Sequence, residues 1–411
     1  MKKQLLALCI ASTISMPALA DQSVEVLHWW TAGSEAAALN VLKTNLEKQG
    51  ITWNDMPVAG GSGEAAMTTV RTRVISGNPP TAVQMQGFDI TNWANEGVLA
   101  DINDIATAGN WDTVVPTAIQ AFSKHDGKWV AAPVNVHSTN WVWANKAVMD
   151  KAGITEVPET WDDFIKAAEK VQAAGFIALA HGGQPWQDAT LFDGVALSTG
   201  GVEYYRKAFV ELDQDTLKSA TTEEVFKRMA QLRQLVDKDF SGRDWNVASG
   251  MVINEQAAFQ IMGDWAKGEF ISAGKVPNQD FLCFRLPGTQ GAITYNADQF
   301  VMFKVGDEFV DAQKKFAAAV MDPSFQIAFN KVKGSVPART DISDSEFDDC
   351  AKKAMKDLVE ANTNNTLLGS IAHAHAVPPS IKNAFFDVIT RHFNGQIDDK
   401  TAVEEMAMAA Q

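Results

Sequence analysis

The sequence has few cysteines, no tract of basic residues and no obvious membrane-spanning segment. Three of its 411 residues are cysteines, so the fold must depend on a buried core rather than on a disulfide framework. The apolar run near its start spans roughly ten residues, whereas a transmembrane helix needs about 20. The formal net charge is −15, which argues against nucleic acid or an anionic membrane as partner, because Lys and Arg supply most of the binding to both.

The first 20 residues have the three parts of a secretory signal peptide. Lys2-Lys3 form the charged start, an apolar run extends from Leu5 to Ile14, and Ala18-Leu19-Ala20 precedes Asp21 as a cleavage site. We therefore exclude residues 1–20 from the fold and expect an exported mature chain that begins at Asp21.

Export decides how the cysteines are interpreted. Cys9 lies inside the apolar run, after Leu8 rather than after a small residue, so we expect no lipid anchor. Cys283 and Cys350 remain after cleavage, in a compartment where disulfides persist. An even number of cysteines in an exported chain favours a bridge, and two inert buried thiols are the alternative.

Short apolar runs alternate with helical patterns along the mature chain. The run over 24–27 predicts a strand, and apolar residues at helical spacing over 39–46 predict a helix that Gly50 ends. Thr160 is the predicted N-cap of another helix, which Gly175 ends. This alternation indicates α/β layers with parallel sheets.

The mature length, about 390 residues, exceeds one ordinary core and predicts two domains. No repeat and no low-complexity linker divides the chain. We therefore expect the chain to cross between the domains more than once. The extended stretches Val130–Val136 and Ile293–Phe303 are the candidate crossings.

Motifs of enzymes and metal sites are mostly missing. The segment Gly60–Glu64 lacks the Lys of a phosphate-binding loop and does not match a nucleophile elbow, so it predicts a turn. His373 and His375 lie two residues apart with no acidic or Cys ligand nearby, which is a weak metal motif. A glycosidase needs two carboxylates about 5–10 Å apart in space, and the sequence leaves that alternative open.

Tryptophan is abundant, with 12 copies, and several stand beside glycine or polar residues. Trp29 and Trp30 follow a predicted strand, where α/β sheets bind ligands, and Trp186 and Trp265 follow Gly-containing segments. A flat indole matches the C–H face of a pyranose, and its N–H seeks a polar partner. Each ring taken alone is more typical of a core; as a set they favour a sugar site.

Polar side chains that suit sugar hydroxyls occur at similar places. A carboxylate accepts from two hydroxyls at once, and a lysine donates up to three hydrogen bonds. Each residue taken alone is more typical of a solvated surface or a helix cap. The candidates are Glu35, Gln84, Gln86, Asp298, Lys333 and His373.

Seven segments spread along the mature chain carry a resemblance to a known family. They are His28-Trp29-Trp30 with Gly33 and Glu35, Gly77-Asn78-Pro79-Pro80 with Gln84, Pro133-Val134-Asn135-Val136-His137, Pro158-Glu159-Thr160-Trp161, Met262-Gly263-Asp264-Trp265, Pro287-Gly288-Thr289, and Lys333-Gly334-Ser335-Val336-Pro337-Ala338-Arg339. On these segments the chain resembles the extracellular solute-binding proteins (family 1) of carbohydrate ABC importers, and within them the bacterial glucose-binding proteins.

The resemblance implies an α/β fold of type II, which is two-lobed and similar to maltose-binding protein, with the ligand cleft between the lobes. The first lobe would comprise residues 21–133 plus 298–345 and the second residues 134–297 plus 346–411. The function it implies is a periplasmic, monomeric receptor without cofactor, metal or enzymatic activity, which delivers its sugar to a membrane permease.

The resemblance also implies a monosaccharide ligand, with glucose first and mannose or galactose as alternatives. The ring would lie between Trp29 or Trp30 and Trp265. Relatives have His where this chain has Gln86, so the finer sugar preference stays open. The predicted ligand-binding residues are Trp29, Trp30, Glu35, Gln84, Gln86, His137, Trp186, Trp265, Asp298, Lys333 and His373.

Overall fold

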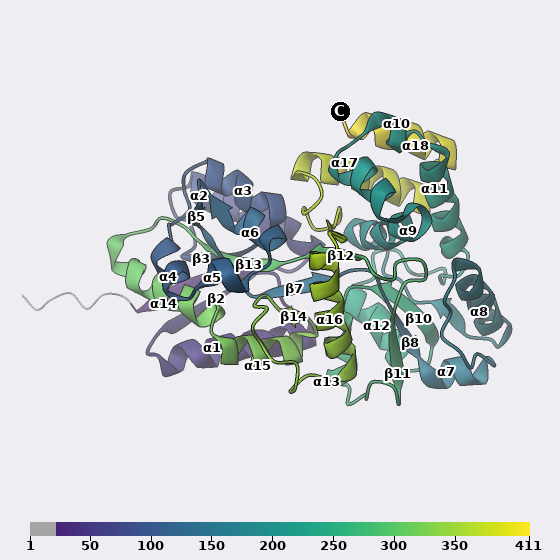
Figure 1. Cartoon of the computed structure of the whole chain (residues 1–411), viewed down its shortest axis with the longest axis horizontal. Coiled ribbons are helices and arrows are strands. Elements are labelled where there is room, and N and C mark those ends of the chain that lie inside the picture. Colours follow the sequence, from purple (N-terminus) through teal and green to yellow (C-terminus); the bar gives the residue numbers. More distant parts are fainter. Residues whose placement is uncertain (1–21) are drawn as a thin grey trace, which may run out of the picture.

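The computed structural model describes residues 22–411, which form two lobes beside each other (Figure 1). The predicted signal peptide, residues 1–20, and Cys9 lie outside the described residues. Within residues 22–411 no helix combines the length and apolar character that a membrane crossing requires.

The first lobe is built on a five-stranded sheet in the order β2-β1-β3-β13-β6. Its strands are β1 (Ser23–His28), β2 (Thr52–Pro57), β3 (Ala82–Gln86), β6 (Ala131–Pro133) and β13 (Asp298–Met302). β1 is parallel to β2 and β3, whereas β13 is antiparallel to β3 and β6. The expectation of parallel sheets is therefore wrong for this edge, because β13 enters from a later part of the chain.

Helices cover both faces of this sheet. Val24 and Val26 of β1 face the core that contains Leu39, Leu42 and Leu46 of α1, whereas Leu27 faces a second core under α2. The predicted apolar helix face over 39–46 is thus confirmed, as is its end, since Gly50 has φ +77°. The elements are α1 (Gly33–Lys48), η1 (Gly61–Gly63), α2 (Glu64–Ile75), α3 (Gly87–Asn95), α4 (Asn103–Ala108), α5 (Trp111–Val114), α6 (Thr117–Ser123), β4 (Lys124–His125), β5 (Lys128–Trp129), η3 (Asp307–Phe309), α14 (Val310–Val320) and α15 (Pro323–Lys333).

The second lobe has a four-stranded sheet in the order β11-β8-β10-β9. Its strands are β8 (Trp141–Asn145), β9 (Ile177–Leu179), β10 (Ala257–Met262) and β11 (Phe281–Arg285). β8 is antiparallel to β10 and β11, and β10 is parallel to β9. This sheet too is mixed rather than parallel.

The helices of the second lobe include the one predicted after Thr160. The Thr160 Oγ1 accepts a hydrogen bond of 3.2 Å from the backbone N–H of Asp163, which confirms the predicted N-cap. These elements are α7 (Lys146–Lys151), α8 (Trp161–Ala173), α9 (Pro185–Tyr205), η2 (Arg206–Val210), α10 (Gln214–Leu217), α11 (Ala220–Arg233), α12 (Trp245–Ile253), α13 (Ala266–Ser272), α17 (Pro379–Phe393) and α18 (Asp399–Ala409).

A third sheet lies between the lobes, next to α16 (Asp349–Thr363), near the centre of Figure 1. It contains, in order, β14 (Val336–Pro337), β7 (Asn135–Ser138), β12 (Ile293–Asn296) and β15 (Leu367–Gly369). β6 and β7 are separated by one residue yet belong to different sheets, and the same holds for β12 and β13. Both candidate crossings, Val130–Val136 and Ile293–Phe303, therefore contain a change of sheet.

A disulfide joins Cys283 of β11 to Cys350 in the first turn of α16. The bridge is thus the correct one of the two alternatives for these cysteines. It ties the second-lobe sheet to the helix beside the central sheet.

Candidate ligand-binding site

A cavity of about 320 Å³ lies between the lobes, where β1 and β3 end and β13 begins. Every predicted ligand-binding residue except Gln84 lines it. These residues are Trp29, Trp30, Glu35, Gln86, His137, Trp186, Trp265, Asp298, Lys333 and His373.

Local structure explains why these side chains converge. β1 ends at His28, so Trp29 and Trp30 stand at its carboxyl end. Asp298 begins β13, and its Cα pairs with that of Gln86 at the end of β3. The remaining residues come from helix ends, one central strand and one loop: Glu35 in the first turn of α1, Lys333 at the end of α15, Trp186 in the first turn of α9, Trp265 before α13, His137 on β7 and His373 between β15 and α17.

The tryptophans divide between the cavity wall and the core. Trp30 is 2% exposed, and its ring lies 5.8 Å from that of Phe300 and 5.3 Å from that of Phe329, centroid to centroid. Most of Trp30 is therefore core, whereas Trp29 is half-buried. On the second lobe the ring of Trp265 lies 6.3 Å from that of Trp186. Aromatic faces thus reach the cavity from both lobes.

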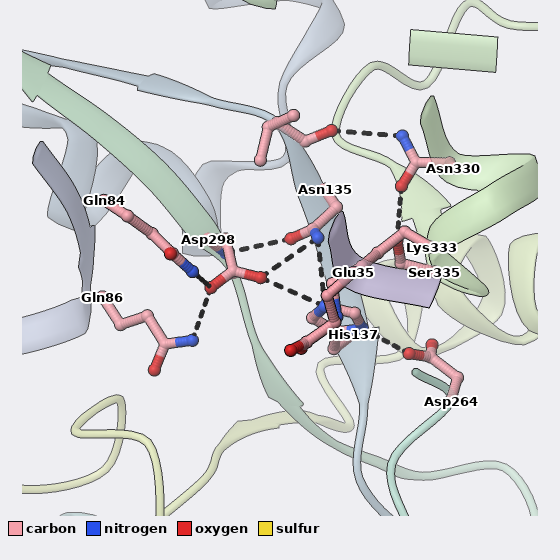
Figure 2. A network of polar contacts seen from close by, with 12 residues as sticks. Glu35, Gln84, Gln86, Asn135, His137, Asp264, Asp298, Asn330, Lys333 and Ser335 are labelled. Atoms are coloured by element: carbon pink, nitrogen blue, oxygen red, sulfur yellow. Dashed lines mark hydrogen bonds and ion pairs between the residues drawn. The ribbon is translucent and has the colours of Figure 1, made fainter. Parts of the chain in front are cut away.

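Asp298 is the centre of a buried network of hydrogen bonds (Figure 2). Its Oδ1 accepts from the amides of Gln84 and Gln86, at 2.9 and 2.7 Å. Its Oδ2 accepts from Asn135 and His137, at 3.1 Å each. A carboxylate has about four lone-pair sites, so protein donors occupy all of them. Asp298 in this arrangement orients its neighbours rather than presenting an unused acceptor.

Gln84 lies behind the wall and is fully buried. While its amide donates to Asp298, its Oε1 accepts a hydrogen bond of 3.2 Å from the backbone N–H of Trp29. The residue therefore connects the carboxylate network to the strand end that carries the first aromatic face.

His137 is held between two carboxylates. Its Nδ1 contacts Asp264 and its Nε2 lies 3.1 Å from the Asp298 Oδ2. Burial alone lowers the pKa of His137, but the attraction of Asp264 and Asp298 outweighs it and the pKa is raised. Although burial opposes it, the contact with His137 in turn holds the pKa of Asp298 far below its usual range. The contacts with two carboxylates thus favour the imidazolium form of His137, and Asp298 is a carboxylate.

Glu35 and Lys333 form a second ion pair at the wall, with 3.1 Å between Oε1 and Nζ. The other oxygen of Glu35 accepts a hydrogen bond of 3.3 Å from the Ala32 N–H and so caps the start of α1. The Lys333 ammonium also lies 5.6 Å from the centroid of the Trp30 ring. The pair therefore holds two helix ends together and leaves ammonium donors for a ligand.

His373 and His375 belong to the loop 370–376, between β15 and α17. The His373 Nδ1 lies 2.9 Å from the Ser370 Oγ. His375 donates from Nδ1 to the His373 carbonyl and accepts at Nε2 from the Ala297 N–H. Burial lowers the pKa of both, that of His373 well below its usual value and that of His375 to about 4. Residues 22–411 contain no group of three or more His, Cys, Asp or Glu side chains arranged to hold a metal ion.

The sequence did not single out several residues of the wall. Trp245 stands at the start of α12 beside polar residues, as Trp186 and Trp265 do, so the same criterion would have found it. Gly60, Gly61 and Ser62 are at the wall although their segment predicts only a turn. The wall also includes Thr31, Ala32, Ala59, Gln184, Asp244, Asn246 and Asn296.

Asn296 is the most informative of these residues. It is 1% exposed, and its Oδ1 has no hydrogen-bond partner within residues 22–411. An unsatisfied buried carbonyl oxygen costs about 1–3 kcal/mol. A ligand hydroxyl at this wall would satisfy it.

Comparisons with known proteins agree with this geometry. The family model described as "Bacterial extracellular solute-binding protein" matches residues 31–327. A protein of Rhizobium meliloti (strain 1021), named "Probable sugar-binding periplasmic protein", is 58% identical over 405 residues, which cover 98% of this chain and 97% of that protein.

Solved structures share the fold. A "Chitin oligosaccharide binding protein" superposes with a TM-score of 0.80 at 21% identity, covering 94% of this chain and 98% of that chain. "Maltose bound T. maritima MalE3" gives a TM-score of 0.77 at 17% identity, covering 94% and 98%. These two likenesses confirm the predicted two-lobed fold similar to maltose-binding protein. Because the family model matches well over half of the residues, the chain belongs to the bacterial extracellular solute-binding proteins.

Proposed function

We propose that the cavity binds one monosaccharide, glucose first among the aldohexoses, and that the protein delivers it to the membrane permease of an ABC importer. The family is one of solute receptors rather than enzymes. Relatives named as sugar-binding periplasmic proteins, at 58% and 56% identity, support sugar as the class of ligand and the periplasm as the location.

The size and lining of the cavity carry this proposal. Its volume of about 320 Å³ is near the lower end of small-molecule sites, which supports a single ring over a chain of sugars. Trp29 and Trp265 offer aromatic faces from opposite lobes, while Lys333 and the unsatisfied Asn296 supply a donor and an acceptor. Stacking surfaces with polar groups around them match a pyranose.

The carboxylates at the wall support binding rather than hydrolysis. A glycosidase needs one carboxylic acid that gives up a proton and a second carboxylate nearby. Asp298 stays ionised because its pKa is held far below the usual range, and Glu35 is paired with Lys333. Neither is placed as a general acid.

Titration calorimetry with a set of sugars tests the proposal. We expect glucose to bind most tightly, mannose and galactose more weakly, and maltose weakest because a second ring exceeds the cavity. Tighter binding of mannose or galactose would reassign the sugar. Tightest binding of maltose would refute a single-ring site, and binding of no sugar would refute the proposal altogether.

A matched pair of tryptophan variants locates the site. Trp29 at the cavity and Trp53 on β2 are both half-buried, but Trp53 does not line the cavity and lies under Lys43. Removing a stacking platform costs about 1–3 kcal/mol by analogy with bases, so Trp29→Ala should weaken binding about ten- to a hundredfold. Trp53→Ala should bind as the wild type does. Equal affinities for both variants would place the sugar elsewhere.

We further propose that the lobes are discontinuous, residues 21–133 plus 298–345 and residues 134–297 plus 346–411, and that the protein is a monomer. The place of β13 inside the first-lobe sheet supports this division. Residues 21–133 produced alone should fail to fold, because their sheet lacks β13 between β3 and β6. A folded fragment would refute the division, and a dimer in light scattering would refute the monomer.

A further inference from the structure

The loop 370–376 is fastened to the second lobe by Asp193. Asp193 lies on α9 and is fully buried. Its Oδ1 accepts from the Tyr205 hydroxyl at 2.7 Å and from the Ile371 N–H at 3.1 Å. Its Oδ2 accepts from the Ser370 hydroxyl and, at 3.4 Å, from the Ala372 N–H. The carboxylate therefore fixes the backbone that leads to His373.

The same loop is also fixed from the first lobe. The Phe88 N–H donates to the Ala374 carbonyl at 2.8 Å, and a Cβ on Gly87 would come within 1.9 Å of that oxygen. Ala374 itself has φ +52°, in the left-handed region that non-glycine residues rarely adopt. The imidazole of His373 is thus held from both sides at the cavity wall.

The hydrogen bonds of the Ser370 hydroxyl determine the tautomer of His373. Ser370 has one hydroxyl hydrogen, and Asp193 can only accept when it is ionised. Burial raises the pKa of Asp193 to about 6, so it is ionised at neutral pH. The Ser370 hydrogen then points to Asp193, and the Ser370 Oγ is left as an acceptor. The His373 Nδ1, 2.9 Å from that oxygen, must carry the proton.

The opposite ring nitrogen, Nε2, is free of the Ser370 contact. Burial, followed by the neighbouring His375 and His137, keeps the pKa of His373 well below its usual value, so the ring is neutral. With Nδ1 protonated, Nε2 carries a lone pair, and it has no hydrogen-bond partner within the described residues. His373 lines the cavity.

We propose that Asp193, acting through Ser370, is a positioning residue that fixes His373 as the Nδ1–H tautomer, so that Nε2 accepts a hydrogen bond from one hydroxyl of the sugar. The inference rests on the proposed function for its ligand. The ligand group next to His373 Nε2 must therefore be a hydrogen-bond donor, and a group that can only accept would bind there poorly.

The tautomer is measured first, without sugar. Long-range ¹H–¹⁵N spectra of protein labelled at histidine distinguish Nδ1–H from Nε2–H. We expect His373 as Nδ1–H in the wild type and a shift toward Nε2–H in Ser370→Ala. Tyr204→Phe is the matched control, since it removes a buried hydroxyl of the same helix that donates to Thr222 rather than to Asp193, and it should keep the wild-type tautomer. An imidazolium or an Nε2–H ring in the wild type would overturn the inference.

The demand for a donor is measured with glucose analogues in which one hydroxyl at a time is replaced by fluorine, which cannot donate. At one position the substitution should weaken wild-type binding about ten- to a hundredfold and weaken binding by Ser370→Ala much less, while Tyr204→Phe behaves as the wild type. If no position of the sugar shows this pattern, the proposed hydrogen bond from the sugar to His373 is refuted, even if the tautomer is as expected. If glucose does not bind at all, the proposed function and the hydrogen bond to His373 are both refuted. The spectra then still show whether Asp193 and Ser370 fix the tautomer.

Discussion

Two histidines of the cavity wall, His137 and His373, are both almost fully buried, yet their surroundings favour different charge states, cationic for His137 and neutral for His373. His137 has a carboxylate at each ring nitrogen, Asp264 and Asp298, and these outweigh the effect of burial so that its pKa is raised. His373 has a hydroxyl at one nitrogen and, among residues 22–411, no carboxylate hydrogen-bonded to its ring, so burial lowers its pKa well below the usual value.

The difference separates a structural role from a ligand-binding role. Both nitrogens of His137 and all four acceptor sites of Asp298 are used within the protein, so this region is a closed ionic network that joins the central sheet to both lobes. The region around His373 is neutral and leaves one nitrogen without a protein partner among the described residues. We therefore propose that the first region holds the cavity together and that the second binds the ligand.

Breaking the ionic network should have the largest effect. In Asp298→Ala the cation of His137 and three amides lose their acceptor, and removing one partner of a buried ion pair costs about 3–5 kcal/mol. We expect the free energy of unfolding of the sugar-free protein, measured by urea denaturation, to fall by that amount.

A double-mutant cycle makes this test specific. Asp298→Ala combined with His137→Ala removes both charges, so its loss should be smaller than the sum of the two single losses. If the losses simply add, or if Asp298→Ala unfolds at the wild-type urea concentration, Asp298 does not anchor the network and its direct contact with sugar becomes the better explanation.

Removing the disulfide should have the second-largest effect on stability, and it tests whether stability can be lost without loss of binding. Cys283 and Cys350 are separated by 67 positions, and a bridge of this kind contributes about 2–4 kcal/mol to folding. The variant with both cysteines replaced by Ser should unfold at a lower urea concentration but bind glucose as the wild type does, because neither cysteine lines the cavity. A large loss of affinity would mean that stability and binding are coupled throughout the molecule.

Replacing the neutral histidine should affect binding instead of stability. His373→Ala removes one hydrogen bond to the sugar, so we expect about a ten- to hundredfold loss of affinity in calorimetry and a smaller change in unfolding. His125→Ala, at the partly exposed β4–β5 hairpin, is the matched control and should change neither quantity. An unfolding loss in His373→Ala as large as that in Asp298→Ala would erase the contrast between the two regions.

The sequence predicted the local elements and most of the wall because both depend on local chemistry. A hydroxyl that caps a helix at Thr160 and a glycine that ends one at Gly50 act within a few residues. Tryptophans placed outside apolar runs, such as Trp29 and Trp265, indicated the cavity for the same reason. Membership of the family then supplied the two-lobed arrangement.

The division of roles among these residues was beyond the sequence because it depends on contacts between distant segments. The sequence suggested Asp298 as an acceptor for the ligand, but its four protein donors come from β3 and β7, which precede it by 161 to 214 positions. Trp30 looked like Trp29 until Phe300 and Phe329 placed most of it in the core. No sequence motif pointed to Asn296.

The last prediction compares the two histidines through pH. The pKa of His137 is raised from 6.5, so its contribution to stability is present below pH 6.5 and is lost as pH rises through the folded value. The pKa values of His28, His373 and His375 are lowered from 6.5, so their contributions are present above pH 6.5 and are lost as pH falls. Burial raises the pKa of Asp193 from 3.8 to about 6 and also raises that of Asp89 from 3.8, so these two carboxyls oppose the three histidines in acid.

The sugar-free protein should therefore be most stable near neutral pH and lose stability on both sides. One proton is worth about 1.4 kcal/mol per pH unit. We expect His373→Gln to reduce the acid slope by up to that amount and His137→Gln to remove the loss above neutral pH, in urea unfolding between about pH 4.5 and 8.5. Because only slopes are compared, the absolute stability of each variant does not enter. If His137→Gln retained the alkaline loss, or if the two variants altered the same side of the pH profile, the two histidines would not differ in charge and the division into ionic anchor and neutral acceptor would fail.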